Sequence, residues 1–198
     1  NVTSKWVTVS GTGKDAKLVC HLDDNLKKWI HATKTYATDG YLVGNTADYG
    51  LWQNDWAKEQ SKAGSTLGFF WSTWGINFSL KGYADPKSAG TPTDDNLFGK
   101  YRVCAGPQPY YWGGTWMMGA KGSDDVDFIK QTMKDFTVNA DIMKKITKDT
   151  QDFTNNQTAM EGLAADGSAA SSFLGGQNHI ALFTEAAKKI DLKYISAY

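Results

Sequence analysis

Two short windows of the chain, residues 69–75 and 110–116, combine tryptophan and other aromatic residues with glycine. They hold four of the eight tryptophans: Trp71, Trp74, Trp112 and Trp116. An aromatic ring offers a flat apolar face, and a sugar ring has a matching face of axial C–H groups, while its hydroxyls need polar partners. Both windows lie where a strand pattern runs into a turn, which suits the lining of a groove. The windows indicate a ring-stacking site, unless the same rings fill a core.

The order of residues helps to separate groove rings from core rings. Residues 110–112 are three consecutive rings between proline and glycine, and a strand alternates its faces, so at least one ring must face solvent or a ligand. Trp71 and Trp74 stand in a Ser/Thr/Gly context unlike a core helix. Trp116 precedes two methionines and is expected in the core. Four further tryptophans fit apolar periodicity and are expected to pack: Trp6, Trp29, Trp52 and Trp56.

Patterns for catalysis and metal binding are sparse. No CxxC, nucleophile elbow or phosphate loop occurs, and the three histidines stand far apart in sequence. Two of the adjacent acidic pairs, Asp23-Asp24 and Asp124-Asp125, fall at expected helix starts, where capping explains them, and Asp94-Asp95 falls in a loop. The sequence therefore predicts no metal, no cofactor and no catalytic residues, so the chain is not expected to be an enzyme.

The charge balance favours a neutral ligand. Basic and acidic residues number 21 each, so no net field draws the chain to nucleic acid or acidic lipid. Arg102 is the only arginine, and arginine forks are the usual means of gripping phosphate or carboxylate. No stretch approaches the roughly 20 apolar residues that span a bilayer. Cys20 and Cys104 lie in apolar strand-like runs, which suit two buried free thiols or one disulfide.

Strand and helix patterns alternate, so the fold class is predicted as α/β. Residues 1–22 are expected to be extended around a turn at 11–15, followed by a helix capped by Asp23 or Asp24 and ended by Gly40. Further helices are predicted over 49–62, from a Ser123 cap, over 139–148, around 160–163 and over 178–190. Buried strands are predicted at 66–71, 101–105 and 115–120. The helix after Ser123 is amphipathic, with one apolar face: Val126, Ile129, Met133 and Phe136.

In order, these segments resemble the carbohydrate-binding extracellular solute-binding proteins (family 1) of bacterial ABC importers. The resemblance rests on residues 64–70 running into Trp74, on 101–107, on the Gly113-Gly114 strand that ends at Ala120, and on the helix pair that follows. It implies the C-terminal lobe of a type II periplasmic-binding-protein fold, a mixed sheet flanked by helices. Residues 1–198 would form a single α/β unit, a fragment of a two-lobed protein, with 1–118 and 155–198 in one lobe and 121–152 packing on an absent lobe.

The resemblance also implies a function. The chain would bind a neutral saccharide, an oligosaccharide by preference because successive rings offer successive faces, and deliver it to the permease subunits of an ABC importer. Trp74 is the first stacking residue implied, then Trp112 and Tyr111, then Trp71 and Tyr110, with Gly114 beside them. One lobe alone would bind weakly, since closure on the ligand uses both lobes. The protein would be extracellular or periplasmic, lipid-anchored through an N-terminus not included here, with no membrane insertion of this fragment.

Other interpretations stay open at this stage. A carbohydrate-active enzyme or an accessory carbohydrate-binding module would also use exposed rings. The scarcity of glutamate weighs against the enzyme, and the α/β pattern weighs against the usual all-β module. A peptide could occupy the same groove, and an α/β domain with a purely structural aromatic core is the simplest alternative.

Overall fold

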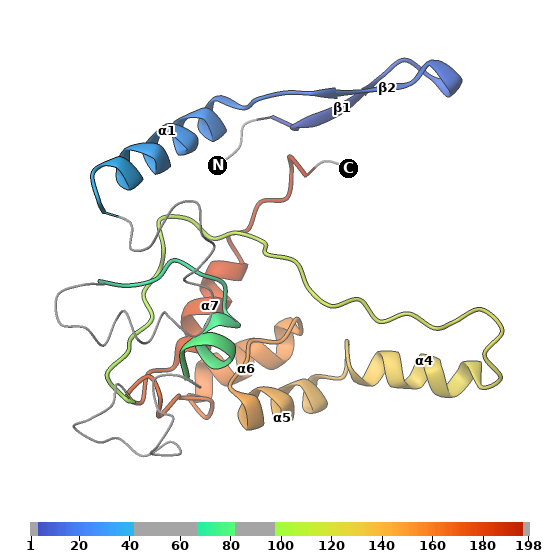
Figure 1. Cartoon of the computed structure of the whole chain (residues 1–198). Helices are drawn as coiled ribbons and strands as arrows, with labels where there is room; N and C mark the ends of the chain where they lie inside the picture. Colours follow the sequence, from blue (N-terminus) through green and yellow to red (C-terminus); the bar gives the residue numbers. More distant parts are fainter. Residues whose placement is uncertain (1–3, 42–66, 82–97, 196–198) are drawn as a thin grey trace. The chain divides into compact units, whose positions relative to one another are not determined.

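The computed structural model describes residues 4–41, 67–81 and 98–195 (Figure 1). The chain divides into two compact units, Asn1–Gly50 with Ile190–Tyr198 and Leu51–Lys189. Within the described residues helices predominate, beside one two-stranded antiparallel sheet. The mixed α and β content predicted from the sequence is confirmed at that level. No helix in this described part is both long enough and apolar enough to cross a membrane.

The first unit begins with a β-hairpin. Strands β1 (Val7–Ser10) and β2 (Lys17–Cys20) pair antiparallel. Between them Gly11 adopts a φ of +83°, and a short 3-10 helix η1 follows at Gly13–Asp15. A Cβ at Gly11 would come within 2.8 Å of the carbonyl oxygen of Asp15, so the turn requires glycine there. The predicted turn is confirmed.

Helix α1 (Asp24–Thr38) follows the hairpin. Its N-cap is Asp23, whose buried carboxylate accepts a hydrogen bond from the Asn25 amide at 2.8 Å. This oxygen satisfies one of the amides that a helix start leaves unpaired. Gly40, at a φ of +76°, lies just beyond the helix end. Both predicted boundaries of this helix are confirmed.

The core positions predicted for this unit are wrong. Trp6 is 41% exposed and Trp29 is 63% exposed, and α1 buries no residue at all. Two short strands and one helix supply too few apolar faces to enclose one another, and a lone hairpin is marginal in water. The periodicity therefore identified the apolar face of α1 correctly but not its burial.

In the second unit, three helices enclose a hydrophobic core: α5 (Ala140–Thr150), α6 (Gln157–Asp166) and α7 (His179–Ala187). Helix α6 packs against both α5 and α7. The buried side chains of this core are Met143, Ala159, Met160, Leu163, Ala169 and Ile180. Apolar patterns predicted α5 and α7, and a short helix was predicted around 160–163. The structure confirms all three helices, and α6 is longer than predicted.

An asparagine begins each of these three helices, and its side chain also reaches back toward the preceding helix. Asn156 accepts from the Ala159 amide at 2.9 Å and donates to the Val138 carbonyl at 3.0 Å. Asn178 caps α7 and donates to the Ala164 carbonyl, at the end of α6, at 3.0 Å. A carboxamide has both a donor and an acceptor, so Asn178 satisfies unpaired groups of two helix ends, whereas the donor of Asn156 bonds the connection between α4 and α5.

A second hydrophobic core lies beside the first in the same unit. It gathers residues from the π-helix η2 (Ile76–Lys81), from the chain after residue 97 and from the loop before α7. Its buried members are Ile76, Phe98, Tyr101, Phe173 and Leu174. Since these stretches are distant in sequence, this core fixes the roots of both aromatic windows.

Helix α4 (Val126–Asp135) is capped differently from the prediction. The carboxylate of Asp125 accepts from the Phe128 amide at 2.9 Å, whereas the Ser123 hydroxyl donates to the Ala120 carbonyl. A carboxylate at the positive end of a helix is the stronger cap, because it adds charge to the hydrogen bond. The helix is confirmed, but its start lies after Ser123.

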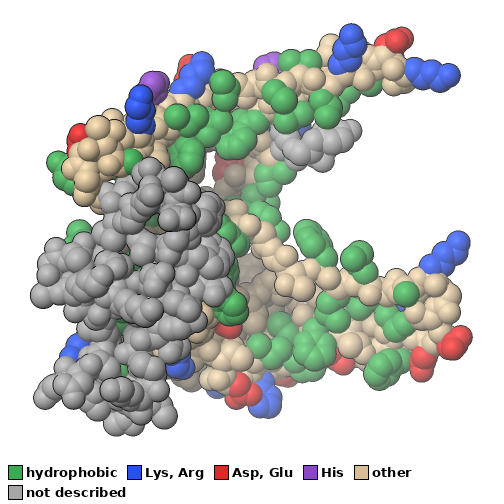
Figure 2. Space-filling view, viewed as in Figure 1, with side chains coloured by type: hydrophobic (Ala, Val, Ile, Leu, Met, Phe, Trp, Pro, Cys, Tyr) green, Lys and Arg blue, Asp and Glu red, His purple; other side chains and the backbone are tan. Residues whose placement is uncertain are grey.

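Helix α4 and the hairpin both expose apolar side chains, as Figure 2 shows along each element. Helix α4 has no buried residue, and Val126 and Phe136 on its predicted face are 51% and 53% exposed. On the hairpin, Val9 and Leu18 are more than half exposed. Neither element contributes to the cores of the described residues.

The three predicted strands are wrong. Within the described residues 67–71, 101–105 and 115–120 form no strand, and the mixed sheet flanked by helices is not found there (Figure 1). Trp116, expected in a core strand, is 79% exposed. A strand forms only where a neighbour completes its hydrogen bonds, and an apolar run cannot indicate whether one is present.

The thiols are neither buried nor paired. Cys20 and Cys104 are free, as the first of the two alternatives had them, but they are exposed, so the burial expected for them is wrong. Each lies on an extended segment without a covering layer, which explains the exposure. The predicted helix over 49–62, with Trp52 and Trp56, and the Asp94-Asp95 pair lie outside the described residues.

Candidate functional site

The two aromatic windows meet in the second unit. The ring of Trp71 lies 5.6 Å from that of Trp74 and 5.2 Å from that of Trp112, centroid to centroid. Trp74 lies 6.3 Å from Trp112, and Tyr110 lies 6.1 Å from Trp112. Such separations are typical of packed aromatic rings. We call these four residues the ring cluster; it joins two stretches that the sequence presents as unrelated.

A tight turn builds the first half of the ring cluster. The Gly75 amide donates to the Ser72 carbonyl at 3.1 Å, and the Phe78 amide donates to the Trp74 carbonyl at 3.0 Å as the chain enters η2. The ring of Phe78 then packs edge-on against Trp74 at 5.6 Å. The turn and the start of η2 therefore hold the indoles of Trp71 and Trp74, three residues apart in sequence, on one short segment.

Gly75 is a site residue that sequence reasoning missed. It is buried, and a Cβ built on it would collide with the indole of Trp71. The ring thus packs directly on the glycine backbone, a position that no other residue can take without moving the ring. The available signal was the glycine that ends the window, but only the fold shows which ring lies over it.

The second half of the ring cluster is half-exposed. Tyr110, Tyr111 and Trp112 are 49%, 52% and 54% exposed, so the expectation that at least one of these rings faces solvent is confirmed. Trp71 and Trp74 are intermediate in exposure. The cluster is therefore packed together on one side and open on the other, as a stacking platform must be.

Two predicted site residues stand apart from the ring cluster. Tyr111 has no ring partner among the described residues, and the strand-like geometry that would aim it beside Trp112 is absent. At Gly114 a Cβ would meet no atom within 4 Å, so nothing there demands a glycine for space. The structure therefore assembles Trp71, Trp74, Trp112 and Tyr110, and leaves Tyr111 and Gly114 outside.

Two polar groups of the ring cluster's own segments are neutral, the phenol of Tyr110 and the hydroxyl of Ser72. Partial burial raises the pKa of Tyr110 and keeps its phenol protonated. Ser72, between the two indoles in sequence, has a buried hydroxyl without a hydrogen-bond partner in the described part of the chain. A protonated phenol and a hydroxyl are suited to bonding other hydroxyls. The cluster thus offers rings and neutral polar groups.

The single arginine serves the backbone. Its Nη1 donates to the Gly99 carbonyl at 2.9 Å and to the Tyr101 carbonyl at 2.6 Å. No carboxylate pairs with Arg102 among the described residues. Its Nη1 is thereby committed to backbone carbonyls.

The buried histidine is also structural. His179 is 1% exposed, and its Nε2 lies 2.8 Å from the carbonyl oxygen of Gln151. A carbonyl only accepts, so Nε2 carries the proton, while the ring packs edge-on against Phe183 at 5.6 Å. Gln151 has a left-handed backbone with φ of 62° at the end of α5, and this hydrogen bond holds it there. Within the described residues, no three His, Cys, Asp or Glu side chains gather as metal ligands would.

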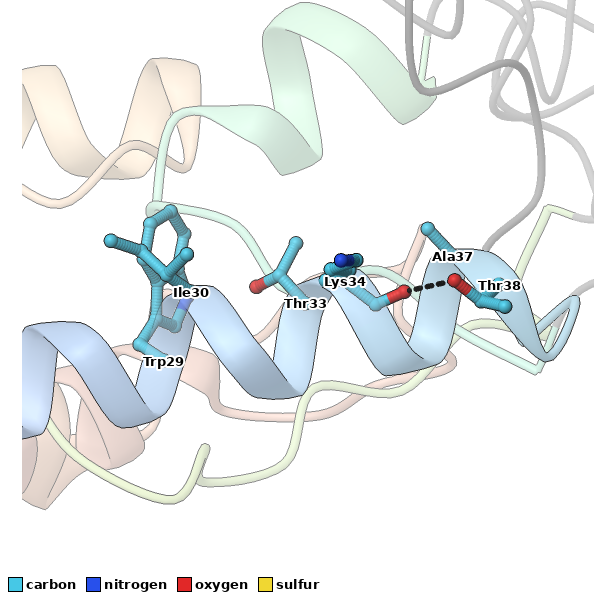
Figure 3. A pocket seen from close by; sticks show the side chains of 6 residues that line it. All are labelled: Trp29, Ile30, Thr33, Lys34, Ala37 and Thr38. Carbon is cyan, nitrogen blue, oxygen red and sulfur yellow. Dashed lines mark hydrogen bonds between the residues drawn. The ribbon is translucent and has the colours of Figure 1, made fainter.

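Hollows elsewhere in the described chain do not coincide with the ring cluster. One lies along α1 and is lined by a single helix face, including Trp29, Ile30 and Thr33 (Figure 3). Along the same face the Thr38 hydroxyl donates to the Lys34 carbonyl at 2.9 Å. A surface with one helix for a wall cannot surround a ligand. The ring cluster is the better candidate site.

No protein-family model matches this chain, and no curated protein or solved structure matches it.

Proposed function

We propose that this chain binds a neutral saccharide, an oligosaccharide by preference, through the ring cluster. The observation that carries the proposal is the assembly of Trp71, Trp74, Trp112 and Tyr110 from two separate windows into one half-exposed group. A structural core would have closed over these rings, yet Trp112 and Tyr110 keep about half of their surface exposed. Exposed rings at fixed mutual angles suit a ligand with several flat apolar faces.

The angles between the rings favour a saccharide over a single flat ligand. Trp71 and Trp74 stand at 80° to one another, and Trp71 and Trp112 at 47°. One planar molecule could stack on only one of these faces at a time. Successive sugar rings change direction at each glycosidic bond, so they can meet differently oriented indoles. The phenol of Tyr110, which is 49% exposed, is a neutral partner of the kind that sugar hydroxyls need.

The wider role is proposed from the family resemblance. As an extracellular or periplasmic solute-binding protein, lipid-anchored at its N-terminus, the whole protein would close two lobes on the sugar and present it to importer permease subunits. This chain would contribute the C-terminal lobe of the type II fold. The exposed apolar face of α4 supports a second lobe, since α4 belongs to the segment 121–152 expected to pack on it. The other helix of that segment, α5, packs on α6 of this chain instead.

Binding without hydrolysis is part of the proposal. Glycoside hydrolysis needs two carboxylates about the scissile bond. Asp23 and Asp125 serve as the N-caps of α1 and α4, and their carboxylate oxygens accept hydrogen bonds from backbone amides. We therefore expect incubation with an oligosaccharide to release no new reducing ends.

The test is a saccharide titration that tolerates weak binding. Indole N–H resonances of the tryptophans are followed by NMR while linear oligosaccharides, their monosaccharide units and a neutral peptide are added. For one lobe we expect saturable shifts confined to Trp71, Trp74 and Trp112, with a dissociation constant of about 1 mM. Shifts caused equally by the peptide, or no shift with any saccharide, would overturn the proposal. Release of new reducing ends would show that the chain hydrolyses the saccharide, and the proposal of binding without hydrolysis would be wrong.

A further inference from the structure

The turn Ser171–Gln177 is a rigid support in the second unit. Gly175 and Gly176 have φ of +60° and +83°, values that only glycine adopts freely. The Gly176 amide donates to the Ser171 carbonyl at 2.8 Å, and the Ser171 amide donates to the Gln177 carbonyl at 3.0 Å. The fully buried Ser171 hydroxyl also donates to Gln151 at the end of α5. The turn is thus closed on itself and fixed to the helical core.

Gln177 pairs with the backbone of Val103 in both directions. Its Nε2 donates to the Val103 carbonyl at 2.7 Å, and its Oε1 accepts from the Val103 amide at 2.8 Å. An antiparallel strand neighbour exchanges the same two hydrogen bonds with one residue. The carboxamide therefore takes the place of a strand partner for a segment that the sequence predicts as a strand and that has no sheet beside it.

Neighbouring contacts fix the same segment to the turn. The Gly99 amide donates to the Phe173 carbonyl at 2.9 Å, and the ring of Tyr101 lies 5.2 Å from that of Phe173. A Cβ at Gly175 would collide with the guanidinium of Arg102, so that group lies on the turn itself. Residues 99–103 are therefore held along the turn, and the chain from Val103 leads on to the window that contains Trp112.

The same turn supports the other window. Phe173 and Leu174 share a core with Ile76, which directly follows Gly75 and the Trp71–Trp74 turn. The two halves of the ring cluster are consequently rooted in one place. Because the chain runs from Val103 to Tyr110 and Trp112 without an intervening helix or strand, we expect a shift at Val103 to move these two rings, while Trp71 and Trp74 stay with Ile76.

We propose that Gln177 is a positioning residue of the ring cluster: it sets the segment carrying Tyr110 and Trp112 against Trp71 and Trp74. Its role as part of a binding site rests on the proposed function, but its effect on ring geometry does not. The geometry is measurable without ligand, because two indoles 5.2 Å apart couple their transitions and give an exciton signal in circular dichroism.

The experiment compares Gln177→Met with a matched control, Gln157→Met. Gln157 is an exposed glutamine at the start of α6 that bonds only to Glu161 among the described residues. In Gln177→Met we expect the exciton signal to fall to the part that Trp71 and Trp74 give by themselves, because Trp112 moves away from them. Exchange of the Val103 amide is expected to rise by at least about tenfold, which corresponds to about 1.4 kcal/mol. Gln157→Met keeps both readouts.

A second variant separates positioning from general stability. Leu163→Val weakens the core of α5, α6 and α7 and leaves the turn unchanged, since Leu163 belongs to that core. It is expected to lower the unfolding temperature and keep the exciton signal. If Leu163→Val lost the signal as Gln177→Met does, at an equal loss of stability, the assignment would be wrong. Retention of the full wild-type signal in a folded Gln177→Met would also overturn it.

Gln177→Glu adds a pH profile that a purely structural role would not produce. A glutamate ionises at a pH of about 4.3, and its carboxylate cannot donate a hydrogen bond to the Val103 carbonyl. Protonated, it regains one donor and one acceptor. The part of the exciton signal that comes from Trp71 and Trp112 should be absent from this variant at neutral pH and return in acid, while the signals of the wild type and Gln177→Met do not change with pH. A pH-independent Gln177→Glu contradicts the proposal. Absence of saccharide binding by the wild type would overturn the proposed function alone.

Discussion

The indole of Trp71 lies on the backbone of Gly75 and, at 5.2 Å, against the indole of Trp112. Trp71 is thus the ring of the first window that lies nearer to Trp112, since Trp74 lies 6.3 Å from it. The Trp71 indole rests on Gly75, which has no side chain, so the distance between the indole and the backbone depends on the glycine. The angle at which Trp112 meets it is set from the other side, through Val103 and Gln177. The site therefore depends on residues that never touch a ligand.

Gly75→Ala tests the first of these supports. Its added methyl group collides with the Trp71 indole, and Gly75 lacks the positive φ that would add backbone strain. We expect the exciton signal to weaken and saccharide affinity to fall about tenfold, with a loss of stability of about 1–3 kcal/mol from overpacking. Gly68→Ala is the control, because its Cβ would meet no atom within 4 Å. Equal effects of the two substitutions would contradict the packing argument.

Trp112→Ala measures the stacking contribution directly. Trp112 contacts three rings of the cluster and is 54% exposed, so its removal costs binding more than folding. Aromatic pairs contribute about 0.5–1.5 kcal/mol beyond area burial, which corresponds to a loss of affinity of up to about tenfold. NMR titration of the remaining indoles measures it. Trp116→Ala, at a residue 79% exposed and outside the cluster, should leave the dissociation constant unchanged.

Tyr101→Phe tests alkaline stability. Burial raises the pKa of Tyr101 from 10.0 to about 12, so the folded state holds the phenolic proton more tightly than the unfolded state. This contribution is complete below pH about 10 and is lost as pH rises through about 12. The variant should lose less stability over that window than the wild type, in urea melts at stepped pH.

The same substitution has a second expected effect at neutral pH. The Tyr101 hydroxyl is buried without a hydrogen-bond partner among the described residues, so its removal is expected to be neutral or to stabilise by up to about 1 kcal/mol. Tyr111→Phe, at an exposed tyrosine, is the matched control. A clear loss of stability at neutral pH in Tyr101→Phe would mean that the hydroxyl has a partner.

Substitutions at Asn178 test whether its one carboxamide joins α6 and α7. Asn178→Ala loses the cap of Ala181 and the bonds to the carbonyls of Leu163 and Ala164, and should cost about 2 kcal/mol. Asn178→Asp keeps the capping oxygen and loses only the donor, so about half that cost is expected. Urea denaturation gives both values. The exposed Asn155 is the control position, where either change should stay within about 0.5 kcal/mol.

The helices of this protein were predictable because their signals are local. Asp23, Asn139, Asn156 and Asn178 each lie next to the amides that they cap, and the apolar spacing of α6 and α7 repeats within the helix itself. The hairpin within residues 1–22 was predictable in the same way, whereas, within the described residues, the buried strands predicted at 66–71, 101–105 and 115–120 were wrong. Val103 lies in an apolar run typical of a buried strand, but its partner is the side chain of Gln177, far along the sequence.

The candidate site divides in the same way. The two aromatic windows stand out in the sequence by composition, and four of the six predicted residues meet. Gly75 and Gln177 do not stand out, because their importance comes from what packs over them in the fold. The burial of Trp116 was predicted from a strand that needs a neighbour, and without that neighbour the ring is exposed.

Helix α4 has ten residues and buries none of them. An isolated helix of that length is marginal in water, so Asp125 and the local charges are its chief stabilisers. The helix is therefore a separate thermodynamic element: it can melt without costing α5, α6 and α7 their core. The fraction of α4 that is helical then depends chiefly on whether another surface packs against Val126 and Phe136. Helix content in this segment should therefore report such packing separately from the unfolding of the rest of the chain.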